Sequence, residues 1–168
     1  RLDEGDLGRA PRNWWRAAGL AQLFKRQDGV LISDYGYGSV TSEAWMRMRK
    51  TAPAVVVLDS RAASAAYPGV TAITPNWSEA EALLGDEITE NTLDRAGSAL
   101  RKKLRVPFLL LKRGPAGLSL FGTGKPFHVP AWGDPAVDVT GAGDSVAAAF
   151  TLALACGAEP LQAAILAN

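Results

Sequence analysis

The chain has 168 residues, of which 48% are hydrophobic and 21% charged, and this composition is typical of one globular domain with its own hydrophobic core. A net charge of +1 provides no general attraction to nucleic acid or to an anionic membrane surface. No apolar run reaches the roughly 18 residues of a membrane span, and no signal-peptide pattern is present, so we expect a cytoplasmic protein.

In chain order, the first half alternates stretches of helical apolar spacing with short continuous apolar runs. Apolar residues at helical spacing predict amphipathic helices, and short β-branched runs predict buried strands. Residues 1–12 are polar and glycine-rich, which is typical of a loop. The elements predicted after this loop are a helix over Trp14–Gln27, a strand over Val30–Asp34, a helix over Thr41–Lys50 capped by Thr41 or Ser42, and strands over Ala54–Asp59 and Val70–Thr74.

The second half contains longer helices and a hairpin. Its first predicted helix, Ser78–Leu84, begins with a serine and has acidic residues in its first turn, so we expect Ser78 to cap it. The elements predicted after it are a helix over Asn91–Arg105, a strand over Phe108–Leu111, a hairpin of Leu118–Phe121 with Pro126–Pro130, and helices over Val146–Ala155 and Leu161–Ala167. Strands that alternate with helices predict one α/β domain, a Rossmann-like three-layer sandwich around a mostly parallel sheet.

Polar side chains follow several of the predicted strands at the point where each strand ends. In parallel α/β sheets, ligands bind beyond the carboxyl ends of the strands. We therefore expect the strand-end residues to meet at one edge of the sheet and to form a binding site there. These residues are Asp34, Asp59, Asn76 and Lys112.

A turn of small residues, Gly141-Ala142-Gly143, directly precedes an apolar helix and is bracketed by Asp138 and Asp144. The unpaired amides of a helix N-terminus and the helix dipole attract anions, and glycine lets a backbone approach a phosphate closely. A carboxylate would repel a phosphate there. It is useful, however, if Asp144 must accept a proton from a hydroxyl that attacks phosphorus. The alternative is that Asp144 only caps the helix and that the glycines only make a tight turn.

Asn76 and Glu79 are three residues apart at a predicted strand-to-helix junction, where they can share one face. An amide oxygen and a carboxylate in that position can hold a hydrated Mg²⁺ ion, which takes few protein ligands. The alternative is a plain turn with Glu79 in the first helical turn.

The strand that ends at Leu111 is followed by two cations and two glycines. Lys112 or Arg113 can contact a nucleotide phosphate, and Gly114 and Gly117 can let the backbone approach the nucleotide. The alternative is a plain β-turn.

Other candidate sites have weaker support. Gly124-Lys125 is not part of a Walker-type phosphate loop, because Ser119 stands where the earlier glycine belongs. His128 has no Ser or Cys partner by spacing, which argues against a Ser–His or Cys–His nucleophile. Cys156 is the only cysteine, which excludes an internal disulfide, and its Ala and Leu neighbours predict a buried side chain.

The order of three segments resembles the ribokinase-like carbohydrate kinase family, also called the phosphofructokinase B family. The segments are Asn76-x-x-Glu79, Gly114-x-x-Gly117 and Asp138-Val139-Thr140-Gly141-Ala142-Gly143-Asp144. The resemblance covers about residues 29–168 and implies the ribokinase-like fold. Within the family, the last segment together with residues 33–36 and 74–79 looks most similar to the D-glycero-D-manno-heptose 7-phosphate kinase branch.

The resemblance implies a role for each matching residue. Asp144 would be the catalytic base, and Gly141, Ala142 and Gly143 would form the anion hole for the transferring phosphoryl group. Asn76 and Glu79 would organise Mg²⁺ and the phosphates, and Asp138 would help to position a monovalent cation such as K⁺. The residues implied to line the nucleotide site are Lys112, Gly114, Gly117 and, near the adenosine, Asn168.

The function implied by the resemblance is ATP-dependent transfer of the γ-phosphate to a hydroxyl of a sugar or sugar phosphate, such as heptose 7-phosphate. The implied cofactors are ATP and Mg²⁺, and the implied assembly is a homodimer. Residues 1–168 would be the C-terminal, nucleotide-binding portion of the kinase domain, without the N-terminal sugar-site and lid portion.

Two positions depart from the heptose kinase branch. Tyr37 stands where that branch has Lys, and Ser60-Arg61 stands where Pro-Lys often follows Asp59. Because the family's sugar site would lie in the N-terminal portion, two other function classes stay open. One is a nucleotide-binding module without catalytic activity, and the other is a nucleotide-sugar transferase.

Overall fold

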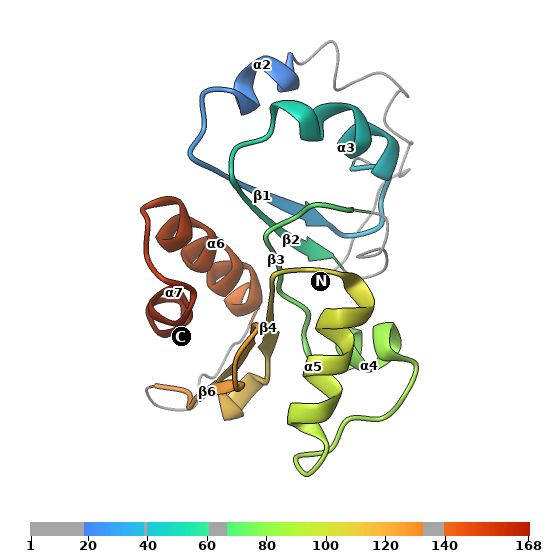
Figure 1. Cartoon of the computed structure of the whole chain (residues 1–168), viewed down its shortest axis with the longest axis vertical. Helices are drawn as coiled ribbons and strands as arrows, with labels where there is room; N and C mark the ends of the chain where they lie inside the picture. The colour runs from blue at the N-terminus through green and yellow to red at the C-terminus, as the bar shows by residue number, and fades with distance from the viewer. Residues whose placement is uncertain (1–18, 39, 61–66, 133–139) are drawn as a thin grey trace.

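The computed structural model describes residues 19–38, 40–60, 67–132 and 140–168. Its centre is a six-stranded sheet in the order β1-β2-β3-β4-β5-β6 (Figure 1). The strands are β1 Gly29–Asp34, β2 Val55–Ser60, β3 Ala72–Ile73, β4 Phe108–Lys112, β5 Leu118–Phe121 and β6 Phe127–Val129. The first four strands are parallel, whereas β5 and β6 form an antiparallel hairpin next to β4. The predicted mostly parallel sheet is thus confirmed.

Helices cover both faces of the sheet. Figure 1 shows α4 and α5 on one side of β4 and the pair α6 and α7 on the other, while α2 and α3 lie beyond β1. The helices are α2 Leu20–Phe24, α3 Ser42–Met48, α4 Trp77–Leu84, α5 Leu93–Leu104, α6 Ala142–Ala155 and α7 Pro160–Leu166, with short 3₁₀ turns η1 Arg49–Thr51 and η3 Gly114–Ala116. Among the helices in the described ranges, none has the length and apolar character needed to cross a bilayer.

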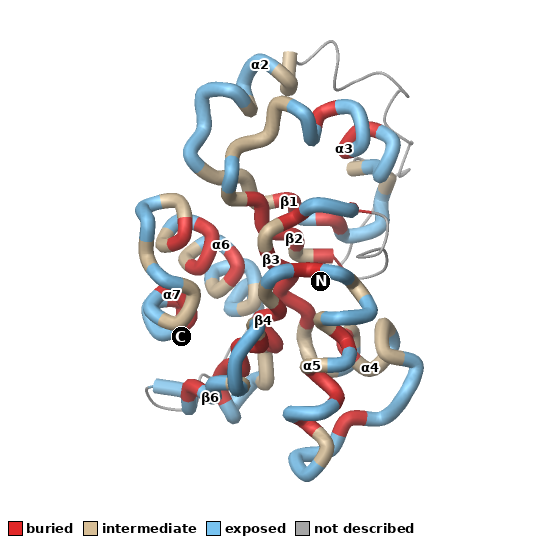
Figure 2. Tube along the Cα trace, viewed as in Figure 1, coloured by how far each residue is buried: buried red, intermediate tan, exposed pale blue. Residues whose placement is uncertain are grey.

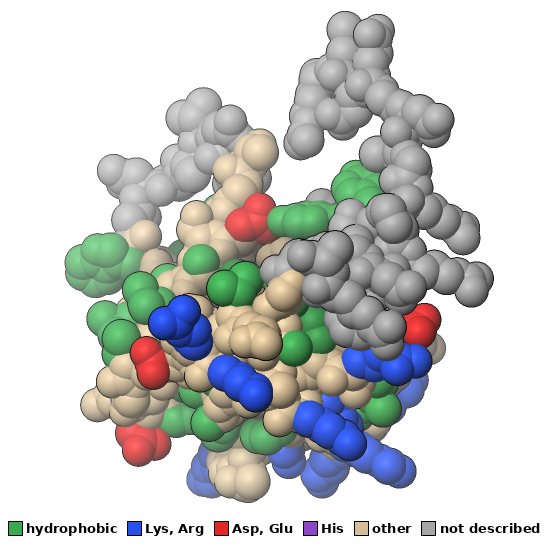
Figure 3. Space-filling view, turned by 90° about the horizontal axis from the view of Figure 1, so that it is seen from above, with side chains coloured by type: hydrophobic (Ala, Val, Ile, Leu, Met, Phe, Trp, Pro, Cys, Tyr) green, Lys and Arg blue, Asp and Glu red, His purple; other side chains and the backbone are tan. Residues whose placement is uncertain are grey.

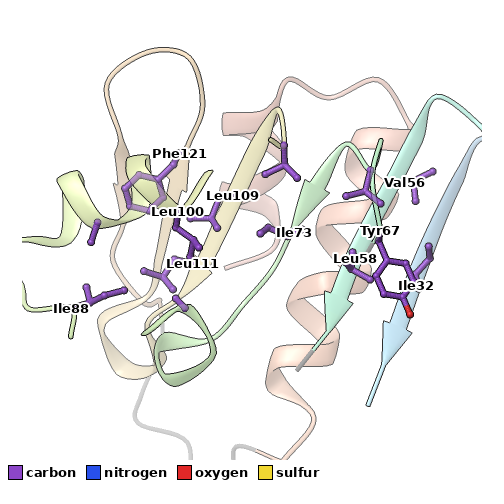
Figure 4. Close-up of a cluster of buried hydrophobic side chains, with 14 of the residues drawn as sticks. Ile32, Val56, Leu58, Tyr67, Ile73, Ile88, Leu100, Leu109, Leu111 and Phe121 are labelled. Carbon is purple, nitrogen blue, oxygen red and sulfur yellow. The ribbon is translucent and has the colours of Figure 1, made fainter. Parts of the chain in front are cut away.

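Alternating residues of the central strands pack into two separate cores. Leu109 and Leu111 of β4 point into the core under α4 and α5, which Figure 4 shows, and Leu110 points into the core under α6 and α7. All three side chains are completely buried, and Figure 2 shows the same burial along the strands. Since burying a Leu side chain stabilises a fold by roughly 1.5–3 kcal/mol, β4 anchors both layers.

The helix α4 begins earlier than the sequence predicts, because Asn76 and not Ser78 is its N-cap. The Asn76 side chain accepts a hydrogen bond from the backbone N–H of Glu79, and the Glu79 carboxylate accepts one from the N–H of Asn76, at 2.9 Å each. This reciprocal capping box satisfies two amides that the helix cannot pair internally. The prediction that Ser78 caps the helix was wrong, and its hydroxyl instead donates to Asn76 Oδ1.

Other elements also differ from the prediction in extent, among them β3 and α2. Strand β3 has only two residues, and just before it the hydroxyl of Thr71 accepts the hydrogen bond of Val56 N–H in place of a strand carbonyl. Of the helix predicted over Trp14–Gln27, α2 covers the part from Leu20 to Phe24, and residues before Gly19 lie outside the described ranges. On the face seen in Figure 3, basic side chains lie among apolar and acidic ones, in keeping with the small net charge.

Candidate active site

A cavity of about 800 Å³ brings together the side chains that follow the parallel strands. Its lining includes Asp34, Asp59, Asn76 and Lys112, the four residues that the sequence predicts at this edge of the sheet. It also includes Glu79, Gly114 and residues 140–144. The volume lies within the range of roughly 300–1,000 Å³ that is usual for small-molecule sites.

The small-residue turn starts helix α6 at the rim of this cavity. Gly141 is the N-cap, with a φ of 82° that favours glycine, and the first intrahelical hydrogen bond runs from Ser145 N–H to Gly141 C=O at 2.9 Å. The N–H groups that precede Ser145 in the helix therefore have no intrahelical acceptor. Ala142 and Gly143 both line the cavity, so the turn can present amides to an anion there.

Asp144 is the third helical residue, and its carboxylate is exposed in the cavity instead of buried in the apolar interior. The hydroxyl of Tyr35 donates a hydrogen bond to Asp144 Oδ1 at 2.7 Å, although the two residues are 109 positions apart. The carboxylate is thus placed where it accepts a hydrogen bond from a hydroxyl group. Sequence reasoning missed the contribution of Tyr35, which local spacing does not signal.

Lys112, at the end of β4, carries a positive charge to the same turn. Its ammonium contacts Asp59 Oδ1 at 2.7 Å, and both side chains are nearly buried. A Cβ atom on Gly143 would lie 3.4 Å from Lys112 Nζ, so the lysine runs directly alongside the turn. The ammonium is therefore close to the amides that begin α6.

Asn76 and Glu79 line the cavity while they cap helix α4, so the alternative reading of a helical turn describes part of what they do. Glu79 Oε2 accepts the Asn76 N–H bond, and Asn76 Oδ1 accepts bonds from Glu79 N–H and the Ser78 hydroxyl. Within the described ranges, no three His, Cys, Asp or Glu side chains gather into a metal site. A carboxylate on the cavity wall still fits Mg²⁺, which takes one or two protein carboxylates and completes its shell with water and phosphate oxygens.

The remaining predicted nucleotide residues divide into two groups. Gly114 lines the cavity. Gly117 is not among the described residues that line it, and a Cβ at this position would lie only 2.0 Å from the carbonyl oxygen of Val129. Asn168 is likewise outside the lining, and its side chain donates to the carbonyl of Pro130 at 2.6 Å. Asp138 lies outside the described residues.

Asp34 forms a buried anchor at the end of β1. Its carboxylate accepts hydrogen bonds from Gly36 N–H at 2.9 Å and from the Tyr67 hydroxyl at 2.7 Å. Burial raises the pKa of Tyr67 well above its ordinary value, and the hydrogen bond and the charge of Asp34 raise it further. Tyr67 therefore stays a neutral donor, and it holds the start of the loop that carries Tyr35.

Two expectations outside the site need correction. His128 has a serine partner after all, since Ser119 Oγ lies 2.8 Å from its Nδ1, and Asp94 Oδ1 lies 2.9 Å from its Nε2. Ser119 is completely buried, so no substrate can reach its hydroxyl, and the sheet pairing between β5 and β6 explains the contact. Cys156, expected to be buried, is exposed because it lies past the last residue of α6.

Residues 38–168 match the family described as pfkB family carbohydrate kinase. The chain belongs to this family. This pfkB family chain is 36% identical over 151 residues to the Bifunctional protein HldE of Psychromonas ingrahamii and 37% identical over 152 residues to that of Aeromonas salmonicida. The alignments cover 88% and 89% of this chain but only 32% of each relative, so the chain spans about a third of the length of these curated relatives.

Solved structures agree with the family and confirm the ribokinase-like fold. Ribokinase from Thermotoga maritima superposes with a TM-score of 0.69 at 26% identity, over 88% of this chain and 50% of that protein. Arabidopsis thaliana ribokinase complexed with ribose and ATP gives 0.72 at 24% identity, over 87% of this chain and 49% of the other. Phosphofructokinase-2 from Escherichia coli in complex with potassium gives 0.78 at 20% identity, over 93% and 53%.

Proposed function

We propose that this chain carries the phosphoryl-transfer site of an ATP-dependent carbohydrate kinase, which moves the γ-phosphate of ATP to a hydroxyl of a sugar or sugar phosphate. The observation that carries the proposal is the position of Asp144. Its carboxylate faces the cavity, directly follows the exposed amides of the Gly141–Gly143 turn, and accepts a hydroxyl hydrogen bond at 2.7 Å. Family membership and the ribokinase structure complexed with ribose and ATP support the same reaction class.

Each part of the site has a distinct task in this reaction. Asp144 accepts the proton of the acceptor hydroxyl, and a positioned base of this kind contributes roughly 10²–10⁴ in rate. The amides of the Gly141–Gly143 turn face the oxygens of the transferring group, and losing one such donor costs roughly 10²–10³ in other enzymes. Lys112 adds a positive charge beside them, where charge neutralisation matters most for phosphoryl transfer.

The proposed cofactors follow from the donors on the cavity wall. Mg²⁺, when bound, neutralises charge on the phosphates of ATP. Glu79 and Asn76 are the residues that we propose to organise it, and Asp138 is proposed to help to hold a monovalent cation such as K⁺. For the nucleotide we propose Lys112 and Gly114 on the cavity wall, with Gly117 and Asn168 further away.

For the acceptor we propose heptose 7-phosphate as the first substrate to test. The sequence similarity of residues 33–36 and 74–79 to the heptose 7-phosphate kinase branch supports this choice. Tyr37, where that branch has Lys, lines the cavity and is exposed, so it can contact the acceptor directly. We further propose that residues 1–168 form the nucleotide-binding portion of the kinase domain and that the protein acts as a homodimer.

The test is release of ADP by the complete gene product with ATP, Mg²⁺ and a panel of sugars and sugar phosphates that includes heptose 7-phosphate. Asp144→Asn keeps an oxygen that can accept the Tyr35 hydrogen bond but removes the basic charge. We expect turnover to fall by roughly 10²–10⁴ with ATP affinity nearly unchanged. Near-normal turnover in this variant would refute Asp144 as the base.

Two results would favour the other function classes. ATP binding without ADP release on any acceptor would indicate a nucleotide-binding module. Release of pyrophosphate in place of ADP, when a sugar phosphate is supplied, would indicate a nucleotide-sugar transferase.

A further inference from the structure

Asp59 places a further carboxylate in the cavity, beside Asp34, Glu79 and Asp144, at a position where it opposes the binding of an anion. It lies at the end of β2, its side chain is about nine-tenths buried, and it lines the same cavity as the α6 turn. By Coulomb's law, a fixed negative charge there weakens the binding of a polyphosphate. A carboxylate in this place therefore needs another task.

The contacts of Asp59 indicate what that task is. Its Oδ1 atom accepts hydrogen bonds from two donors, the Lys112 ammonium at 2.7 Å and the Thr74 hydroxyl at 2.9 Å. Thr74 is completely buried and belongs to the segment that follows β3, so its hydroxyl is fixed by the packed sheet. The Thr74 hydroxyl thus orients the Asp59 carboxylate, and the carboxylate in turn orients the ammonium.

The geometry points to Asp59 as a positioning residue that, together with Thr74, holds the Lys112 ammonium against Gly143, where it meets the transferring phosphoryl group. This inference rests on the proposed function. A free lysine side chain samples many rotamers, and its flexible stem loses that freedom when the ammonium is held in one place. Because the ion pair already restricts the lysine side chain, part of this entropy is lost before the substrate binds, and the positive charge is already in place.

Gly143 shows how closely the lysine is fitted to the turn. A Cβ atom here would lie 3.4 Å from Nζ and 3.7 Å from both Cδ and Cε of Lys112. A Cβ atom at this position would therefore be in van der Waals contact with the end of the lysine side chain.

The decisive variant is Thr74→Val, because it removes the hydroxyl and leaves both charges in place. We expect the chain to bind inorganic tripolyphosphate about threefold to tenfold more weakly after this change, measured by isothermal titration calorimetry with and without Mg²⁺. Thr74→Ser keeps the hydroxyl and is expected to bind as the wild type does. Glu43→Gln is the matched control, since it removes a carboxylate from the exposed ion pair with Arg47.

Asp59→Ala gives a test that depends on the sign of the effect. If Asp59 acts only through its charge, its removal strengthens tripolyphosphate binding, whereas the positioning role predicts weaker binding by a similar factor. Circular dichroism melts identify the variants that fold, and the Asp59→Ala result decides alone if Thr74→Val does not fold. In the complete gene product, Thr74→Val should lower kcat more than it raises KM for ATP, because the ammonium acts on the transferring group.

Three results would overturn the inference. They are unchanged binding in folded Thr74→Val, tighter binding in Asp59→Ala, and a defect in Asp59→Ala that is present only with Mg²⁺, which would make Asp59 a metal-side carboxylate. All three leave the proposed function intact, because the wild-type chain would still bind tripolyphosphate and ATP. A wild-type chain that binds neither would instead refute the proposed function for this chain.

Discussion

Gly117 is predicted to be required by the fold, and replacing it with alanine separates that role from a role in nucleotide binding. Its backbone has a φ of 87° and a ψ of −137°, which L-residues rarely adopt. An added Cβ would lie 2.0 Å from Val129 O, 2.5 Å from Ala131 N and 2.7 Å from Pro130 C. All three are backbone atoms of β6 and the residues after it, so no side-chain rotation can relieve the overlap.

The cost of Gly117→Ala has two parts. Holding a non-glycine residue in such a backbone region costs about 1–3 kcal/mol, and forcing extra atoms into a packed interior costs about 1–3 kcal/mol more. We therefore expect the free energy of unfolding to fall by about 2–6 kcal/mol. For a chain of this length, each kcal/mol lowers Tm by about 2–4 °C, so Tm should fall by about 4 °C or more.

Urea denaturation and thermal melts followed by circular dichroism measure this effect. The matched control is Gly114→Ala in the same turn, where φ is 58° and nothing lies within 4 Å of the added Cβ. Only backbone strain of about 1–2 kcal/mol is expected there. A Gly117→Ala protein as stable as the control, with weakened ATP binding, would refute the packing argument and favour a nucleotide role for Gly117.

Three further predictions concern the cavity and its support. Tyr35→Phe removes the hydrogen bond to Asp144, so steady-state kinetics should show kcat about tenfold lower with KM for ATP unchanged; an unchanged kcat would contradict an orienting role. Glu79→Gln keeps an oxygen for the capping hydrogen bond, so Tm should stay unchanged, whereas half-maximal activity should need more Mg²⁺. An unchanged dependence of activity on Mg²⁺ would argue against a metal role for Glu79. Because the pKa of Tyr67 is raised, the neutral phenol contributes stability that is complete below pH of about 10 and declines as pH rises above it. Urea denaturation at several pH values should therefore show that the difference in the free energy of unfolding between wild type and Tyr67→Phe becomes smaller above pH of about 10. A difference that does not change with pH would contradict this prediction.

The elements of the fold are largely readable from neighbouring residues. Helical spacing and β-branched runs predict all six strands and the order of helices between them, because each pattern lies within one element. The capping box of α4 shows where this reading was incomplete, since Asn76 lies before the residue predicted to cap the helix. Which of two nearby polar residues becomes the cap depends on where the preceding strand ends and the helix begins.

The small-residue turn of α6 was equally visible, because a Gly-Ala-Gly segment followed by an apolar run is a local pattern. The contacts that give the site its chemistry were not visible in this way. Tyr35 and Asp144 are 109 positions apart, and Asp59 and Lys112 are 53 apart. The sequence pattern could place the ends of their strands at one edge of the sheet, but it could not show which side chains are in contact there.

By itself, the sequence determined the layered α/β architecture and the anion-attracting start of α6, because both follow from periodicity and turn chemistry within short segments. Only the tertiary structure decided that Lys112 is held by Asp59, that Asp144 accepts the hydroxyl of Tyr35, and that Gly117 serves the packing of the hairpin. The first pairing depends on strand order and on the parallel register of β2, β3 and β4, and the fit of Gly117 depends on the antiparallel pairing of β5 with β6. These contacts form only when the strands and helices have assembled, so no short sequence pattern predicts them.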